Sequence, residues 1–146
     1  MTENLNFSFV NYRVVQLKFD VNKNFGKKYS SETESIEVNP SIEISYEKEK
    51  NILLVDLTII FDNMKAPFSF LVRCEGMFKF NYDIFNKNME RIVNINCAAI
   101  LFPFVREIIA ELTRRANFPP LLLPPVNFVN LYKKKNNGLP QTEKKN

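Results

Sequence analysis

ILFPFVREIIAELTRRANFPPLLLPPVNF, residues 100–128, joins a helix signal to a segment that cannot be helical. The first part belongs to an apolar stripe with spacings of three and four, which predicts a helix from about residue 97 to 116 with one face toward a core. Pro103 predicts a kink in its first turns, and Asn117 before Phe-Pro-Pro is typical of a helix end. The stripe consists of Ala98, Phe102, Val105, Ile109 and Leu112, widened by Leu101 and Ile108.

The second part, FPPLLLPPVNF at residues 118–128, is a segment that we call the strap. Its two proline pairs fix the dihedral angle φ, remove four N–H donors and keep the residues before them extended. Burying one leucine side chain is worth about 1.5–3 kcal/mol, so the three leucines are expected to rest against other apolar groups. Two interpretations stay open: the strap completes the core, or it forms a stiff wall of an apolar channel.

The N-terminal half of the chain shows the two-residue period of β-strands. Residues 7–21 predict a long strand with a bulge or bend near residues 11–14, because the alternation changes phase there. This phase puts Tyr12 and Val14 on one face of the strand. The opposite face then carries Phe7, Phe9, Val15, Leu17, Phe19 and Val21.

Three more strands are predicted between residues 36 and 80. Residues 36–46 alternate, with Pro40 as an interruption, and the charged residues 47–51 form a turn. Residues 51–61 are apolar on both faces, which predicts a strand buried on both sides. After a turn at 62–67, residues 68–80 form the fourth strand, and short turns between successive strands favour an antiparallel meander.

The second half predicts helices: a short one at about 82–93, the long one, and a last one that begins at Pro125. Strands followed by helices indicate an α+β fold with helices on one face of a four-stranded antiparallel sheet. We expect one domain over residues 1–132 and a disordered, lysine-rich tail over residues 133–146.

The composition excludes several kinds of chemistry. The chain has no histidine, so histidine-based catalysis and the usual zinc sites are not expected. It has three glycines, none in a phosphate-binding loop, so no nucleotide cofactor and no enzyme activity are expected. Cys74 and Cys97 lie in apolar surroundings typical of reduced, buried thiols.

No signal peptide is evident at the N-terminus and the longest apolar run is too short to span a bilayer, so we expect a cytoplasmic protein without membrane insertion.

The positive charge of the chain is confined to its end. Residues 133–146 contain five lysines and one glutamate, a net charge of +4 that equals the net charge of the whole chain. The remaining residues contain 15 basic and 15 acidic groups. The folded part therefore has no basic bias, which makes nucleic acid an unfavoured partner.

Residues 100–128 resemble the signature of the SecB family of protein-export chaperones. In that family a helix with the pattern LFP-x-x-R-E precedes a segment TF-P-x-L-x-L-x-PVNF, and the corresponding residues here read LFPFVRE and FPPLLLPPVNF. The strand before the helix also matches, with Gly76-Met77-Phe78 where the family has G-I/M-F. The order of strands and helices agrees with the family from about Asn51 to Tyr132. The first 50 residues are similar to the family only in their general character, without a matching motif.

The resemblance implies a homotetramer, a dimer of dimers, in which each subunit has a four-stranded antiparallel sheet backed by helices. Family members hold unfolded polypeptides in apolar grooves without ATP, which fits the missing phosphate loop and the many phenylalanines of this chain. Our first hypothesis is therefore a molecular chaperone, a holdase that keeps precursor polypeptides competent for translocation during protein export.

The resemblance also assigns residues to the groove and to the oligomer interface. The groove residues are alternate residues of the fourth strand and two in the loop after the first strand, to which we add residues of the strap and the last helix: Phe68, Phe70, Val72, Cys74, Phe25, Tyr29, Leu121, Leu123, Val126 and Phe128. The alternative interpretation of each of these residues is ordinary core packing. The long helix is expected to form the contact between dimers through Ile100, Val105, Ile109 and Leu112. No catalytic residue and no metal ligand are expected.

The chain departs from the family where the family docks the SecA motor through carboxylates on the outer sheet face. The aligned positions here hold Lys18, Asn22, Ser69 and Leu71, and a lysine-rich tail replaces an acidic one. SecA as a partner is thus less directly implied than unfolded clients. A second hypothesis is a SecB-like chaperone dedicated to one client, such as an antitoxin. A third is a small nucleic-acid binder that acts through the lysine-rich tail.

Overall fold

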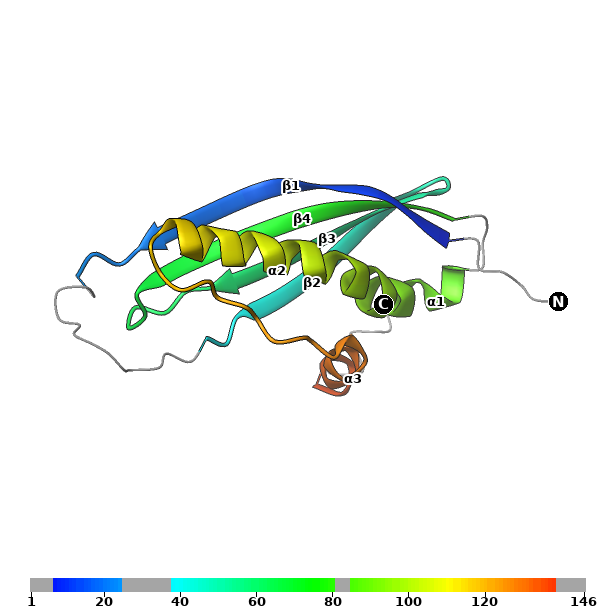
Figure 1. Ribbon diagram of the computed structural model, residues 1–146. Helices are drawn as coiled ribbons and strands as arrows, with labels where there is room; N and C mark the ends of the chain where they lie inside the picture. Colours follow the sequence, from blue (N-terminus) through cyan, green and yellow to red (C-terminus); the bar gives the residue numbers. More distant parts are fainter. Residues whose placement is uncertain (1–6, 25–37, 81–84, 139–146) are drawn as a thin grey trace.

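The computed structural model describes residues 7–24, 38–80 and 85–138, which form an antiparallel sheet with helices on one face (Figure 1). This confirms the predicted α+β class. The order of strands across the sheet is β1-β4-β3-β2. The strands are β1 (Phe7–Val21), β2 (Ser41–Glu49), β3 (Ile52–Phe61) and β4 (Phe68–Phe80).

The predicted meander holds for β2, β3 and β4, but β1 pairs with β4 instead of β2. Two residues, Lys50 and Asn51, connect β2 to β3, and such a short turn forces its strands to pair. The connection over residues 22–40 is long enough to leave β1 and β2 on opposite edges. The sheet therefore has one long edge strand and one short, charged edge strand.

β1 contains two bulges, at Val10 and Val15, where the pairing with β4 skips a residue. The skips keep Phe9, Tyr12 and Leu17 opposite Phe78, Gly76 and Val72, all on the face of β4 that points to the helices. The prediction that Tyr12 and Val14 lie on the other face from Leu17 is wrong, because a second bulge restores the phase that the first one changes.

The core lies between the sheet and the helices. On this inner face, alternate side chains of β3 and β4 are buried, whereas the outer-face side chains of β3 other than Thr58 stay partly exposed. The prediction that this strand is buried on both faces is therefore wrong for the single chain. Residues without exposed surface between the two layers include Leu53, Val55, Leu57, Ile59, Val72, Cys74, Phe78, Leu101, Val105 and Ile109.

The two helices predicted at 82–93 and 97–116 form one continuous helical stretch. It consists of α1 (Phe85–Arg91), a π-helical segment η2 (Ile92–Cys97) and α2 (Ala98–Arg115). The wider π turn joins the two apolar stripes without a break, since Met89 before it, Val93 within it and Ala98 after it are all buried. Pro103 is accommodated inside α2.

α2 ends at the predicted position. The N–H of Phe118 donates to the carbonyl of Thr113, and the N–H of Asn117 donates to that of Arg114, both at 3.0 Å. This is the Schellman arrangement, and Asn117 takes the left-handed conformation that it requires, with φ of 73°. The Phe118 ring then packs edge-on against Phe68 of β4, with ring centroids 5.1 Å apart.

The last helix, α3 (Phe128–Gly138), begins three residues after the predicted start at Pro125. It includes residues 133–138, so the predicted disorder of the tail is wrong for these residues. Residues 139–146 of the tail lie outside the described residues. The lysines at 133, 134 and 135 are therefore presented on a helix whose position is fixed by the fold.

Candidate functional site

The strap runs back from the end of α2 alongside that helix and leads into α3 (Figure 1). Two hydrogen bonds attach its backbone to α2. The N–H of Leu121 donates to the hydroxyl oxygen of Thr113 at 2.9 Å, and Nε of Arg106 donates to the carbonyl of Leu123 at 2.5 Å. The strap is thus fixed by side chains of the helix that precedes it.

These two bonds decide how the three leucines point. Leu123 is 2% exposed and belongs to the core, Leu121 is half-buried, and Leu122 between them is 61% exposed. Phe128, at the end of the strap, is buried against Phe102 of α2, with ring centroids 5.8 Å apart. The strap therefore completes the core with one set of side chains and leaves a large apolar one in solvent.

α3 is held against the rest of the chain by aromatic side chains. Phe128 packs on α2, and Tyr132 lies near Tyr46 of β2, which also lies near Glu90 of α1. Burial raises the pKa of Tyr46, and the charge of Glu90 and the hydrogen bond that the phenol donates to its carboxylate add to this shift. Val129 on the outer side of α3 remains exposed.

The predicted groove residues of β4 are brought together, but under α2 instead of in an open groove. Phe68, Phe70, Val72 and Cys74 all point to the inner face and are buried there. Phe25 and Tyr29 lie outside the described residues. Of the strap residues predicted for the groove, Leu121 and Val126 are accessible, whereas Leu123 and Phe128 belong to the core.

The long helix has little apolar surface left for a partner at two of the predicted positions. Val105 and Ile109 have no exposed surface in the single chain, so they have none to bury against another subunit. Ile100 and Leu112 are half-buried and retain some. The contact between dimers itself stays a prediction.

The most exposed apolar element is β1, which the residue patterns did not single out as a site. Five of its large apolar side chains are about two-fifths exposed, and three of them lie opposite Cys74, Val72 and Phe68, on the helix side of the sheet. The signal was present in the sequence as adjacent valines at 14 and 15 in a strand too apolar for an exposed edge. The five are Val10, Val14, Val15, Leu17 and Val21.

The outer face of the sheet is mixed in charge. Arg13 of β1 pairs with Glu75 of β4 at 2.9 Å, and Glu75 lies opposite Asp56 of β3. Burial raises the pKa of Asp56, and the like charge of Glu75 adds to it. Lys18 lies opposite Leu71, so this part of the face presents a cation and an apolar group.

Asn22, another of the positions aligned with the family's carboxylates, has a structural role. Its side-chain amide donates to the carbonyls of Met64 and Ala66 at 3.3 and 3.1 Å, and its side-chain oxygen accepts from the N–H of Asn24 at 3.1 Å. The end of β1 is thereby fastened to the β3–β4 turn.

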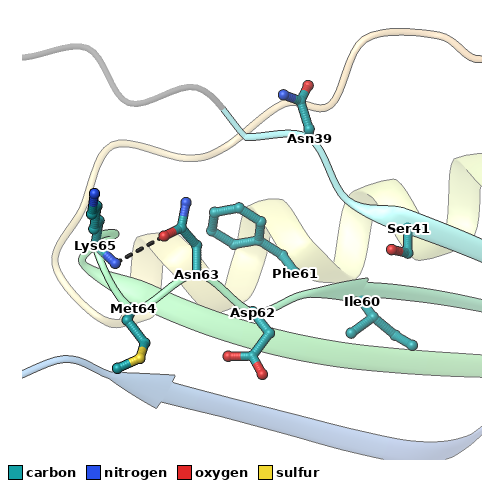
Figure 2. A pocket seen from close by; sticks show the side chains of 8 residues that line it. All are labelled: Asn39, Ser41, Ile60, Phe61, Asp62, Asn63, Met64 and Lys65. Carbon is teal, nitrogen blue, oxygen red and sulfur yellow. Dashed lines mark hydrogen bonds between the residues drawn. The ribbon is translucent and has the colours of Figure 1, made fainter.

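A shallow depression of about 710 Å³ lies at this end of the sheet (Figure 2). Figure 2 shows its side chains pointing to both sides of the strand, without a common focus. Asp62 and Lys65 are its ionisable groups, and the backbone N–H of Lys65 donates to the side-chain oxygen of Asn63 at 2.8 Å. The Ser41 hydroxyl also lines the depression, but no hydrogen bond links it to Asp62 or Lys65 in the described part of the chain.

Both cysteines are fully buried thiols. Burial raises the pKa of Cys74 to about 11 and that of Cys97 to about 12, so neither forms a thiolate near neutral pH. Within residues 7–24, 38–80 and 85–138, no three cysteine or carboxylate groups are arranged to hold a metal ion.

The helical stretch from Asn88 to Arg115 is long and apolar enough to cross a membrane by length and composition, in contrast to the expectation from its longest apolar run. A core helix passes the same test. Leu101, Val105 and Ile109 on this stretch are packed against the sheet, which is the pattern of a core helix.

Comparisons with known proteins agree with the motifs. Residues 15–138 match the family described as "Preprotein translocase subunit SecB". Protein-export protein SecB of Bradyrhizobium diazoefficiens is 45% identical over 69 residues, covering 47% of this chain and 42% of that protein. The matched segment thus spans less than half of that relative. An uncharacterized protein of Methanocaldococcus jannaschii is 34% identical over 128 residues, covering 84% of this chain and 80% of that one.

The fold also has a solved counterpart. A SecB-like chaperone of Mycobacterium tuberculosis, in complex with a peptide from the HigA1 antitoxin, superposes with a TM-score of 0.71 at 14% identity, covering 83% of this chain and 91% of that one. The family match over residues 15–138, the LFPFVRE and FPPLLLPPVNF motifs and this shared fold lead to one conclusion: the chain belongs to the SecB family.

Proposed function

We propose that this protein is an ATP-independent holdase that binds unfolded polypeptides through exposed apolar side chains. The observation that carries the proposal is the strap, in which Leu122 is held 61% exposed on a backbone that is bonded to α2. A stiff segment loses little conformational entropy when it binds, so its apolar surface favours association more than that of a flexible loop. Leu121, Val126 and Val129 extend the surface, which we call the strap surface.

We further propose that the subunits assemble into a homotetramer. Within the described part of the chain, no strand pairs with the outer edge of β1 over residues 8–21, and β1 has five exposed apolar side chains, a combination that monomeric proteins normally avoid. Pairing of β1 with β1 of a second subunit would cover both. The half-exposed side of α2, with Ile100 and Leu112, would then join two such dimers.

The test is size-exclusion chromatography with light scattering, on the protein mixed with a model polypeptide freshly diluted from denaturant, without nucleotide. We expect the polypeptide to elute together with a four-chain assembly. A monomer or dimer that does not retain the polypeptide would contradict the proposal, and the exposed side chains would then need another explanation.

The client class follows from the family. Members named as protein-export proteins make precursor polypeptides in the cytoplasm the first candidates. Delivery to the SecA motor has weaker support, because Lys18 and Leu71 occupy the outer face where the resemblance implies carboxylates. A binding assay with SecA decides this branch, and absence of binding would restrict the protein to holding clients without that transfer.

A chaperone dedicated to one client is the second candidate. Its support is the structural neighbour, which was solved with an antitoxin peptide and shares the fold over 83% of this chain. A dedicated chaperone should protect one partner and ignore most others. Aggregation assays with several unrelated denatured proteins separate the two candidates: general suppression favours the first, and suppression limited to one partner favours the second.

A further inference from the structure

The strap cannot be recognised as a β-strand. Residues 119, 120, 124 and 125 are prolines without N–H groups, and the N–H of Leu121 already donates to Thr113. Only the N–H groups of Leu122 and Leu123 remain between residues 119 and 125. A bound polypeptide therefore cannot build a ladder of backbone hydrogen bonds along the strap, and its selection depends on side-chain chemistry.

The side chains that the strap and α3 offer are apolar or cationic. Leu122 and Val129 are exposed, and Lys133 follows Val129 at the i, i+4 spacing, so the two lie on the same side of α3. Asn130 and Lys134, each one residue further along α3, have the same i, i+4 spacing and lie on the neighbouring part of the helix surface. Residues 118–138 contain three lysines and no acidic residue.

These lysines have no acidic partner within the described part of the chain, where the ion pairs join Arg13 to Glu75 and Arg114 and Arg115 to Glu111. Lys135 lies in the last turn of α3 and is favourably placed at the negative end of the helix dipole. Lys133 and Lys134, one turn after Val129 and Asn130, are left as unpaired cations beside an exposed apolar group.

We propose that the strap surface, together with Lys133 and Lys134, selects extended polypeptide segments in which apolar residues are followed or preceded by acidic ones. This inference rests on the proposed holdase function and names the substrate class of that site. The part of the strap from Leu122 to Asn127 spans at most about 18 Å. An extended client segment of roughly eight residues is therefore long enough to contact both Leu122 and the lysines of α3.

The exposed side chains favour a polypeptide over nucleic acid. Single-stranded nucleic acids are bound through aromatic side chains on which the bases stack. The exposed large apolar side chains among the described residues are valines, leucines and one methionine, without an aromatic ring. Lysines beside aliphatic groups are complementary to carboxylates beside aliphatic or aromatic groups.

The test uses three fluorescent peptides of about twelve residues with the same central apolar residues and with aspartate, serine or lysine in the flanks. Binding to the full chain is measured by fluorescence anisotropy at low and high salt. We expect the acidic peptide to bind roughly three- to tenfold more tightly than the basic one at low salt, because surface ion pairs are individually weak. The difference should shrink near 1 M salt, where the Debye length falls to about 3 Å.

Two double variants locate the effect. Lys133→Glu with Lys134→Glu should abolish or invert the preference for the acidic peptide. Lys65→Glu with Lys79→Glu changes the net charge by the same amount at exposed lysines outside the strap and α3, and should retain the preference. Circular dichroism confirms that both variants are folded.

The outcomes separate this inference from the proposed function. Equal binding of all three peptides, or an unchanged preference in the Lys133→Glu, Lys134→Glu variant, would overturn the inference and leave the holdase intact. Failure of all three peptides to bind would overturn both. Tighter binding of a single-stranded oligonucleotide than of the acidic peptide, lost in the same variant, would overturn the inference in favour of a nucleic-acid site.

Discussion

The side chain of Leu101 in α2 occupies the space that a side chain at Gly76 in β4 would need. A Cβ atom built on Gly76 would lie 2.6 Å from Cδ2 of Leu101, closer than real Cβ contacts. The glycine therefore lets the helix approach the middle of the sheet, where Leu101 is fully buried. This contact sets the spacing of the two layers that build the core.

Gly76→Ala should destabilise the protein by about 1–3 kcal/mol, the usual cost of overpacking a core. Urea unfolding measures the change. Adding Leu101→Ala to the same chain should cost less than Leu101→Ala does in the wild type, since the cavity accepts the new methyl group. Strictly additive effects would show that the two side chains do not compete for one space.

Thr113→Val should loosen the strap, because it removes the acceptor of the Leu121 N–H while keeping the shape of the side chain. Leaving a buried N–H unpaired costs about 1–3 kcal/mol. Thr113→Ser keeps the hydroxyl and serves as the control. Limited proteolysis should cut Thr113→Val faster in residues 118–128 than the serine variant, and equal cleavage would mean that Thr113 does not hold the strap.

Leu122→Ser and Leu123→Ala should separate binding from folding. Leu122 is largely exposed, so its replacement should weaken polypeptide binding and change the unfolding free energy by less than about 0.5 kcal/mol. Leu123 is buried, so Leu123→Ala should cost about 2–5 kcal/mol. Met64→Ser, at an exposed methionine in the β3–β4 turn, is the control and should change neither. Undiminished binding by Leu122→Ser would remove the strap from the site.

Leu17→Lys should interfere with the proposed pairing of β1. The substitution places a charge among exposed apolar side chains of the edge strand. In a single chain the lysine stays in solvent, whereas pairing of two β1 strands would bring it into the contact between subunits. Light scattering should report a smaller assembly at the same protein concentration, whereas Met64→Lys should leave the mass unchanged. An intact tetramer with Leu17→Lys would place the subunit interface elsewhere.

Asp56→Asn should stabilise the protein at neutral pH. The pKa of Asp56 is raised above its ordinary value of 3.8 by burial and by Glu75, so the folded state favours the protonated form. The contribution of Asp56 to stability is thus largest below pH 3.8 and is lost as the pH rises through the folded-state pKa. The gain from Asn should be about 0.5 kcal/mol at pH 7 for this partly exposed group.

Urea unfolding of Asp56→Asn at several pH values provides the measurement. The advantage of the asparagine should disappear as the medium becomes acidic enough to protonate Asp56 in both states. Asp20→Asn, on the same outer face near the end of β1, is the matched control. A gain that does not depend on pH would have to come from packing instead of charge.

Local signals predicted much of the fold. Asn117 and the prolines after it gave the end of α2 within one residue, because the left-handed cap and the missing N–H groups act through adjacent atoms. The alternation in β4 placed Phe68, Phe70, Val72 and Cys74 on one face, as the structure does. The sequence could not show that α2 covers that face, since this depends on contacts such as the one between Gly76 and Leu101.

Non-local features were less predictable. The change of phase in β1 predicted a bulge or bend near residues 11–14, and the two bulges at Val10 and Val15 lie on either side of that range. Nothing in β1 alone indicates that its partner is β4 or that there are two bulges. The exposure of Leu122 and the burial of Leu123 follow from Arg106 and Thr113, which lie several residues away along α2. Three identical leucines in a row contain no information about which one faces outward.

The pairing of β1 with β4 also has a consequence during synthesis of the chain. Residue 21 pairs with residue 68 and residue 7 with residue 80, so each residue of β1 emerges from the ribosome 47 to 73 residues before its partner in β4. At about 5–20 residues per second, the delay is roughly 2–15 s. During this interval β1 has no strand of its own chain to pair with. The nascent chain therefore exposes an aggregation-prone apolar strand until β4 emerges.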